Sequence, residues 1–191
     1  MPLESRRVIY LSPADDVRAA VLAAARAATR SLHVLAYAFT LSDLADVVRA
    51  KHAAGLAVGV VVDRTQSGGR AQKALLQKLV DAGVDVTITT AHGALMHQKI
   101  LLVDAASPQQ GGLGVEHNDS FVVYGSWNFS ASSQAQANTC ITENNGGLCR
   151  YFWHQYEDLR AYGRARYPQL TPAPTGGATT EDEGHADAPL A

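Results

Sequence analysis

The sequence predicts an α/β fold, with a mixed, mostly parallel sheet flanked by helices on both faces. Almost half of the 191 residues are apolar (47%), which is enough for one domain with a sizeable core. In residues 1–90, short apolar runs alternate with amphipathic stretches of helical period, as in βαβ units. The second half instead contains two apolar runs with no helix between them, so the pattern changes there.

Strands and helices alternate through the first half. β-branched and other apolar residues cluster in four runs that we expect to be strands, at 7–11, 31–39, 56–63 and 84–90. Three helices should lie between them: Ser12 is the expected cap of the first, Ser42 of the second, and Ser67 leads into the third. Gly55 and Gly83 follow the second and third helices, where glycine commonly ends a helix.

The second half holds fewer helices. Apolar runs predict strands at 97–104, 120–126 and 138–142. Ser130 is the expected cap of a helix that follows Phe129, and residues 149–166 form an amphipathic helix. Residues 105–119 are rich in Gly, Pro and Gln and predict an inserted surface loop. We therefore expect a domain over 1–167 and a disordered acidic tail over 168–191.

The composition limits the partners and the compartment. Residues 1–167 carry 16 basic and 14 acidic side chains, too small an excess to indicate a polyanion partner. No apolar stretch is long enough for a membrane span, and residues 1–13 lack the apolar segment of a signal peptide. A cytoplasmic location is expected, and secretion stays open if an upstream segment is missing. A bridge between Cys140 and Cys149 also stays open.

The segment 96–104, MHQKILLVD, places polar residues at the start of an apolar run. Residues two apart on a strand face the same way, so His97 and Lys99 should project together. Asp104 has the opposite parity, and we expect it to support the structure rather than to react. A lysine supplies positive charge for a phosphate, and a neutral imidazole can attack phosphorus.

The segment 125–128, GSWN, ends the next predicted strand in a similar way. Ser126 and Asn128 share one parity and supply a hydroxyl and an amide. If the two strands are neighbours, these donors converge with His97 and Lys99 on one phosphate-sized volume. No compact set of carboxylate, Cys or His ligands accompanies them, so we expect neither a metal nor another cofactor.

These two segments together resemble the signature of the phospholipase D superfamily. That signature is His-x-Lys-(x)4-Asp, followed by a Gly-Ser pair with an Asn two residues after the serine. A looser resemblance extends over about residues 7–165. It implies an α/β sandwich and a metal-independent phosphodiesterase, in which two copies of the motif build one active site. One histidine is then the nucleophile, and the other is the general acid.

This chain carries a single motif, so by the resemblance it should form a symmetric homodimer with the active site on the two-fold axis. Two departures accompany the match. Twenty residues (105–124) separate the Asp from the Gly-Ser pair, where the family has about six. The family also often carries a carboxylate that orients the histidine, and Glu143 is the candidate here.

The sequence thus predicts a phosphodiesterase that acts through a covalent phosphohistidine. Its candidate site residues are His97, Lys99, Asn128, Ser126, Asp104 and Glu143, of which Lys99, Ser126 and Asn128 should bind the phosphate. Cleavage of a phospholipid headgroup is slightly favoured by the near-neutral charge, since a nuclease should carry a basic groove. A non-specific endonuclease using the same site is the alternative. A non-catalytic module that binds nucleic acid or a partner is the third reading.

Overall fold

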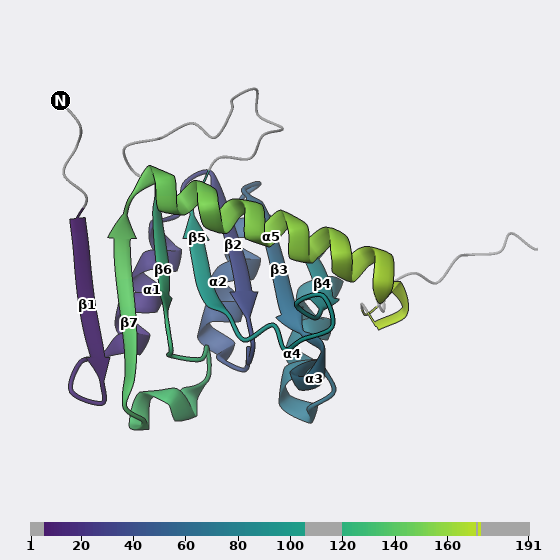
Figure 1. Cartoon of the computed structure of the whole chain (residues 1–191), viewed down its shortest axis with the longest axis horizontal. Coiled ribbons are helices and arrows are strands. Elements are labelled where there is room, and N and C mark those ends of the chain that lie inside the picture. The colour runs from purple at the N-terminus through teal and green to yellow at the C-terminus, as the bar shows by residue number, and fades with distance from the viewer. Residues whose placement is uncertain (1–5, 106–119, 171, 173–191) are drawn as a thin grey trace, which may run out of the picture.

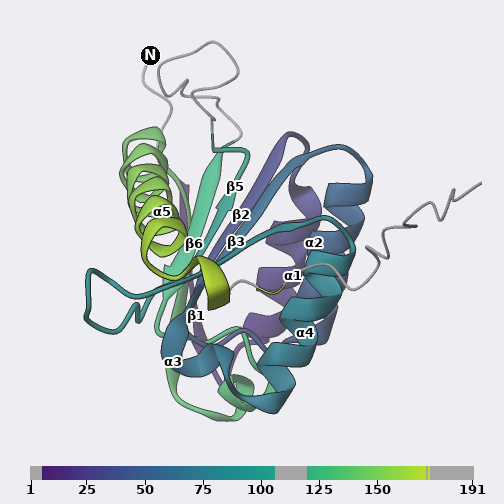
Figure 2. The same ribbon diagram turned by 90° about the vertical axis from the view of Figure 1, so that its right-hand side faces the viewer.

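The computed structural model describes residues 6–105, 120–170 and 172, which form one sheet with helices on both faces (Figures 1 and 2). Its strands are β1 (Arg6–Ser12), β2 (Ser31–Ala36), β3 (Ala57–Asp63), β4 (Asp85–Thr89), β5 (Lys99–Val103), β6 (Phe121–Gly125) and β7 (Asn138–Asn144). Its α-helices are α1 (Val17–Ala27), α2 (Ser42–Ala53), α3 (Arg64–Ser67), α4 (Arg70–Asp81) and α5 (Gly146–Arg166). Two 3-10 helices, η2 (Ala131–Ala135) and η3 (Pro168–Leu170), complete the described elements. The predicted mixed α/β class is confirmed.

The order of the strands is β1-β7-β6-β5-β2-β3-β4, as Figure 1 shows across the sheet. Only β2, β3 and β4 pair in parallel within these residues, and the other four pairings are antiparallel. The parallel part is therefore smaller than the sequence suggested. The physical reason is that β5, β6 and β7 lie between β1 and β2, and a βαβ pattern in the first half cannot reveal that insertion.

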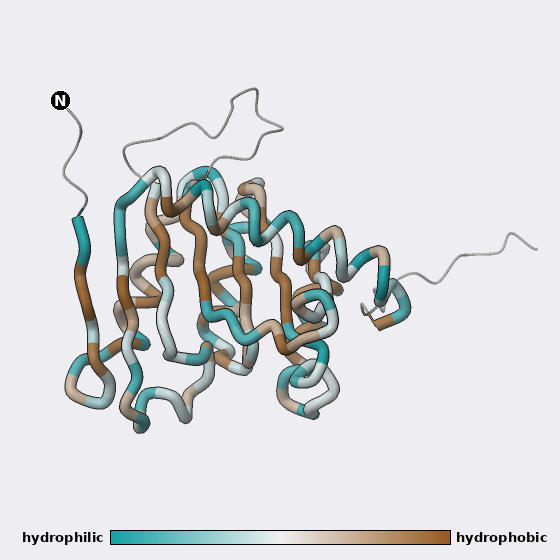
Figure 3. Tube along the Cα trace, in the orientation of Figure 1, coloured by the Kyte–Doolittle hydropathy of each residue, from teal (hydrophilic) through white to brown (hydrophobic). Residues whose placement is uncertain are grey.

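Two apolar layers cover the central strands. Helices α1, α2 and α4 lie against one face of the sheet, and α5 crosses the other (Figure 2). Leu101 and Val103 of β5 pack into the first layer, while Ile100 and Leu102 pack into the second. Because both faces are covered, the central strands are apolar along most of their length (Figure 3). The ends of these strands are thus the places where polar side chains can reach the surface.

Several element ends differ from the sequence-based expectation. Helix α1 begins at Val17 and is capped by Asp16, whose Oδ1 accepts a bond of 2.9 Å from the Ala19 N–H. The expected cap, Ser12, instead donates its hydroxyl to the Gln136 carbonyl (2.6 Å). The helix expected after Ser130 is the 3-10 helix η2, and the Ser130 side chain makes no capping bond there.

Pro168–Leu170, within the range predicted as a disordered tail, is a 3-10 helix. Most of that predicted tail, and the predicted insertion at 105–119 apart from Ala105, lie outside the described residues. Cys140 and Cys149 are both free and pack on opposite faces of the sheet, so the open question of a bridge is answered. In the part of the chain that the structure describes, no helix is long and apolar enough to cross a bilayer.

Candidate active site

The start of β5 brings His97 and Lys99 together at one end of the sheet. Lys99 is the first residue of the strand and pairs with Ala36 at the end of β2, while His97 lies in the segment just before it. Since His97 precedes the strand, strand parity alone does not place it. Contacts to Tyr37 do: its ring centroid lies 4.4 Å from the His97 ring and 4.8 Å from the Lys99 Nζ. The two side chains therefore lie beside the same ring.

The two side chains differ in their exposure. The His97 imidazole is exposed, and neither of its nitrogens makes a hydrogen bond to a described residue. Lys99 is only 4% exposed, and its Nζ donates to the His97 carbonyl at 2.8 Å. Burial lowers the pKa of Lys99 to about 8, against an opposing effect of the Asp63 carboxylate. The ammonium still has two N–H groups for an anion.

Asp63 is a contributor that the sequence did not single out as part of this site. It ends β3 fully buried, and its Oδ2 accepts a 2.8 Å bond from the Met96 N–H, next to His97. Its Oδ1 accepts from the backbone N–H of Thr65 (2.8 Å) and from the Thr65 hydroxyl (2.5 Å). The sequence feature that could have identified Asp63 is an aspartate at the carboxyl end of a buried strand. This carboxylate fixes the backbone that presents His97.

The end of β6 supplies the second half of the motif. The register pairs Ile100 with Tyr124, so both strands reach the sheet end together. Exposed Ser126 is tied to β7, because its N–H donates to the Thr139 carbonyl and its Oγ accepts from the Thr139 N–H, both at 2.9 Å. The half-buried Asn128 has a buried Oδ1 with no hydrogen-bond partner among the described residues.

Asp104 lies at the opposite end of β5 from His97. Its carboxylate accepts bonds from the Thr29 N–H and hydroxyl, from the Arg30 N–H and from the Ser31 N–H, at 2.6–3.0 Å. Burial raises the pKa of Asp104, but these bonds outweigh it, and the pKa is lowered overall. Asp104 also adopts a positive φ of 53°. The residue therefore joins β5 to the α1–β2 connection and does not face the reacting groups.

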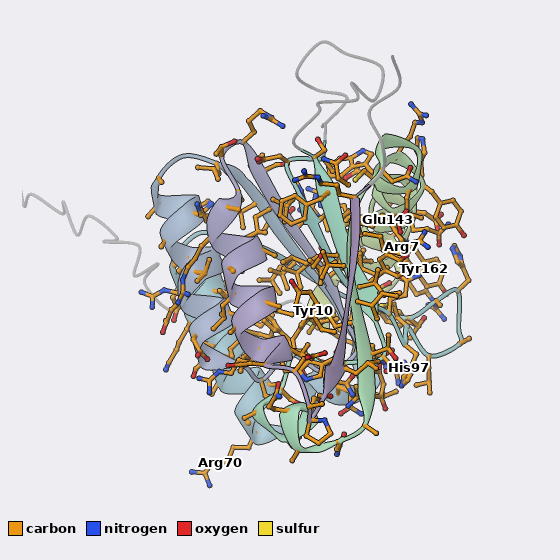
Figure 4. All side chains as sticks on the ribbon, turned by 90° about the vertical axis from the view of Figure 1, so that its left-hand side faces the viewer. Arg7, Tyr10, Arg70, His97, Glu143 and Tyr162 are labelled. Carbon is orange, nitrogen blue, oxygen red and sulfur yellow. The ribbon has the colours of Figure 1, made fainter. Side chains whose placement is uncertain are left out.

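Glu143 is not brought to His97. Its carboxylate accepts from Arg7 at 2.8 and 3.0 Å, from the Tyr124 hydroxyl at 2.8 Å and from the Asn145 amide at 3.3 Å. Figure 4 shows it beside Arg7, away from His97. The bond from Arg7 is the main cause that lowers the pKa of Glu143 to about 2. The expected histidine-orienting role fails for a physical reason: β7 runs away from the site, so that residue 143 lies opposite Val122.

No group of three or more His, Cys, Asp or Glu side chains within the described ranges is placed to hold a metal ion. The chemistry available is that of an exposed imidazole, an ammonium, a hydroxyl and an amide at one sheet end. Such a set can receive the charge of a phosphodiester and attack its phosphorus atom.

Comparisons with known proteins point to one family for this fold. The family model described as "Cardiolipin synthase, PLD-like domain" matches residues 21–159. Nuc from Salmonella typhimurium, described as a phospholipase D family member, is 24% identical with a TM-score of 0.72, over 84% of this chain and 97% of Nuc. NucT from Helicobacter pylori is 16% identical with a TM-score of 0.67, over 83% of this chain and 98% of NucT. The search against curated proteins found no match.

The family model covers most of the chain and includes the whole His-x-Lys-(x)4-Asp and Gly-Ser-x-Asn segments. The two solved structures share the fold over nearly their full lengths. The chain belongs to the phospholipase D superfamily, whose members are phosphodiester hydrolases.

Proposed function

We propose that this protein is a metal-independent phosphodiesterase that forms a covalent phosphohistidine at His97. The observation that carries the proposal is the pairing of an exposed imidazole, free at both nitrogens, with the buried ammonium of Lys99 beside it. The exposed imidazole is accessible to a phosphorus atom. The ammonium is desolvated, which strengthens its attraction for the oxygens of a phosphate.

The reaction would proceed in two displacements. A nitrogen of neutral His97 attacks phosphorus, the bond to the leaving oxygen breaks, and a second histidine gives that oxygen its proton. The second histidine then removes a proton from water, the water oxygen attacks phosphorus, and the phosphorus–nitrogen bond breaks. Lys99, Ser126 and Asn128 stabilise the charge on the non-bridging oxygens in both steps.

A second chain supplies the second histidine in this proposal. One imidazole cannot attack phosphorus and protonate the leaving group in the same step, and each chain carries one motif. Among the other described histidines, His33 is buried under Trp153 and Tyr156, and His92 is paired with Asp158 at 2.6 Å. A two-fold axis beside His97 would bring two exposed imidazoles together, and it would place further donors near the unpaired Asn128 Oδ1.

For the substrate, aromatic and basic side chains at the same end of the sheet as the site favour a nucleic-acid strand over a lipid. Three side-chain rings lie in a row beyond the end of β4. The centroid of the His92 ring is 4.5 Å from that of Tyr162, and the centroid of the Tyr162 ring is 6.2 Å from that of Tyr167. The exposed Arg64 guanidinium lies 5.4 Å from the Tyr167 ring. Aromatic rings with cations bind single strands by base stacking. This group of aromatic rings with Arg64 outweighs the slight preference for a lipid substrate that the net charge suggested.

A phospholipid headgroup is the second candidate, and one observation supports it. Leu95 is 53% exposed two residues before His97, and an apolar side chain at that place can contact an acyl chain.

The test is a pair of assays in EDTA, one on single-stranded and duplex oligonucleotides and one on vesicles of phosphatidylcholine or cardiolipin. His97→Ala should lower the rate on the cleaved substrate on the order of 10⁴-fold, because the nucleophile is lost. His154→Ala, an exposed histidine on α5, is the matched control and should retain the wild-type rate. Activity that survives His97→Ala, or that requires a divalent cation, contradicts the mechanism. Binding without cleavage would instead identify a non-catalytic module.

A mixing experiment tests the shared site. Wild-type chains are equilibrated with a tenfold excess of His97→Ala chains. The activity per wild-type chain should fall about tenfold, because most wild-type chains then pair with an inactive partner. Wild-type activity that is unaffected by the excess, with exchange of chains verified by mass spectrometry, would show that each chain works alone.

A further inference from the structure

Tyr37 is held at both ends beside the two main site residues. It directly follows β2, and its backbone N–H donates to the Gln98 carbonyl at 2.8 Å. At the other end, its hydroxyl accepts a 3.0 Å bond from the amide of Gln66 on α3. Because the main chain and the hydroxyl are both held, the position and the long axis of the ring are fixed.

That ring contacts the two groups that the proposed reaction uses. It lies at 55° to the His97 ring with 4.4 Å between centroids, and the Lys99 Nζ lies 4.8 Å from its centroid. A tilted ring contact restricts how the imidazole turns, and an ammonium over an aromatic face is attracted by the ring quadrupole. The His97 imidazole has no hydrogen bond to any described residue, so this ring is what orients it within one chain.

We infer that Tyr37 is a positioning residue, which sets the direction of the His97 imidazole and keeps the Lys99 ammonium beside it. The role of Tyr37 in catalysis rests on the proposed function, whereas its effect on the positions of His97 and Lys99 does not. No contact with the substrate is required of Tyr37, since it acts through His97 and Lys99.

The charge state of Lys99 gives this inference a distinctive readout. The groups that face the ammonium are the Asp63 carboxylate from β3, the His97 carbonyl and the Tyr37 ring. The ring favours the charged form of the amine, as the carboxylate does, and burial opposes both. Removing the ring should therefore lower the pKa of Lys99 below that of the wild type.

The experiment compares Tyr37→Leu with Tyr37→Phe and with Tyr10→Leu. The phenylalanine variant keeps the ring and loses only the bond to Gln66. Tyr10 is a half-buried tyrosine on β1 that packs against the core, and Figure 4 shows it apart from His97. Tyr10→Leu therefore controls for the stability cost of the same substitution.

NMR without substrate is the first readout. In Tyr37→Leu, the His97 Cε1–H resonance should lose its ring-current shift, and the pKa of Lys99 should fall by about half a unit to one unit. Tyr37→Phe should retain most of both values, and Tyr10→Leu should change neither. An unchanged His97 Cε1–H resonance together with an unchanged pKa of Lys99 in folded Tyr37→Leu would overturn the inference, whatever the activity of the protein.

Kinetics are the second readout and separate this inference from the proposed function. At pH 6.5, Tyr37→Leu should lower kcat on the order of tenfold or more with a smaller change in KM, because the nucleophile is misdirected while Lys99 stays charged. The alkaline limb of kcat/KM should also move to lower pH. If wild-type protein and His97→Ala are equally inactive, the proposed function fails and the NMR result still decides the role of Tyr37.

Discussion

The two ends of strand β5 differ in how far their polar groups are satisfied. At the end where the strand finishes, the Asp104 carboxylate accepts bonds from three backbone N–H groups and one hydroxyl. At the end where it begins, the His97 imidazole makes no hydrogen bond to a described residue, and Lys99 makes one, to a backbone carbonyl. The two ends are separated by only four apolar residues, 100–103.

This difference divides one motif into a structural part and a reactive part. Buried polar groups are normally paired, so a carboxylate with all of its bonds made within the chain stabilises the fold. The buried ammonium of Lys99, with one hydrogen bond to a described residue, is instead a cost to the fold, and such costs concentrate at functional sites. The predictions below test whether stability and activity separate along β5 in this way.

After His97→Ala, the largest effect is expected from Lys99→Met. This change keeps the length of the side chain and removes its charge, so kcat/KM should fall on the order of 10³-fold through lost stabilisation of the phosphoryl oxygens. The fold should become more stable, because a buried ammonium with a lowered pKa is replaced by an apolar group. Urea unfolding and steady-state kinetics on the same preparation measure both. A parallel loss of stability and activity would mean that Lys99 supports the fold instead.

Asp104→Asn should have the opposite profile. The amide cannot accept all the bonds from Thr29, Arg30 and Ser31, and its own N–H groups face other donors. We expect a loss of about 2–3 kcal/mol in the free energy of unfolding, or on the order of 10²-fold in the folding constant. The kcat of the folded fraction should stay within about threefold of wild type. Should kcat collapse while the unfolding midpoint holds, Asp104 would belong to the reactive end.

The pH dependence should also separate catalytic activity from stability. The pKa of Lys99 is lowered from 10.5 to about 8, so kcat/KM should fall about tenfold per pH unit above pH 8 as the ammonium is lost. The unfolded chain binds this proton more tightly, so the contribution of Lys99 to stability rises from pH 8 to pH 10.5. Activity and stability thus change in opposite directions. Lys99→Met is the control, since it should remove this rise.

Much of this architecture follows from residue patterns. The apolar runs at 56–63 and 84–90 correspond to β3 and β4, and the segment around His97 and Lys99 does lead a buried strand. These features are local, because burial on both faces demands a continuous apolar run. The strand parity of Asp104 predicted that its side chain does not join His97 and Lys99. In the structure, Asp104 lies at the other end of the strand.

The features that could not be predicted from the sequence depend on the order of the strands in the sheet. The insertion of β5, β6 and β7 between β1 and β2 is a choice among topologies, and no local pattern encodes it. Glu143 was misassigned for this reason: its spacing from Asn128 is compatible with the site, but the direction of β7 carries it to Arg7. Tyr37 and Asp63 reach His97 and Met96 from other strands, so their roles also required the tertiary structure.

The smallest effect is expected from Glu143→Gln, which tests the assignment of Glu143 to the structural part of the sheet. Its pKa is lowered from 4.5 to about 2, mainly by the bond from Arg7, so its contribution to stability is present above pH 4.5 and is lost as the pH falls toward 2. The variant should unfold at a lower urea concentration than wild type at pH 7, and the difference should shrink as the pH is lowered to about 3.

The kcat/KM of Glu143→Gln should stay within about twofold of wild type, because this carboxylate lies beside Arg7 and away from His97 (Figure 4). Glu157→Gln, at a half-buried glutamate on α5, is the matched control for loss of one negative charge. A tenfold loss of kcat/KM in Glu143→Gln alone would show that the strand end near Arg7 communicates with His97. The division between a structural and a reactive end would then apply to β5 but not to the sheet around it.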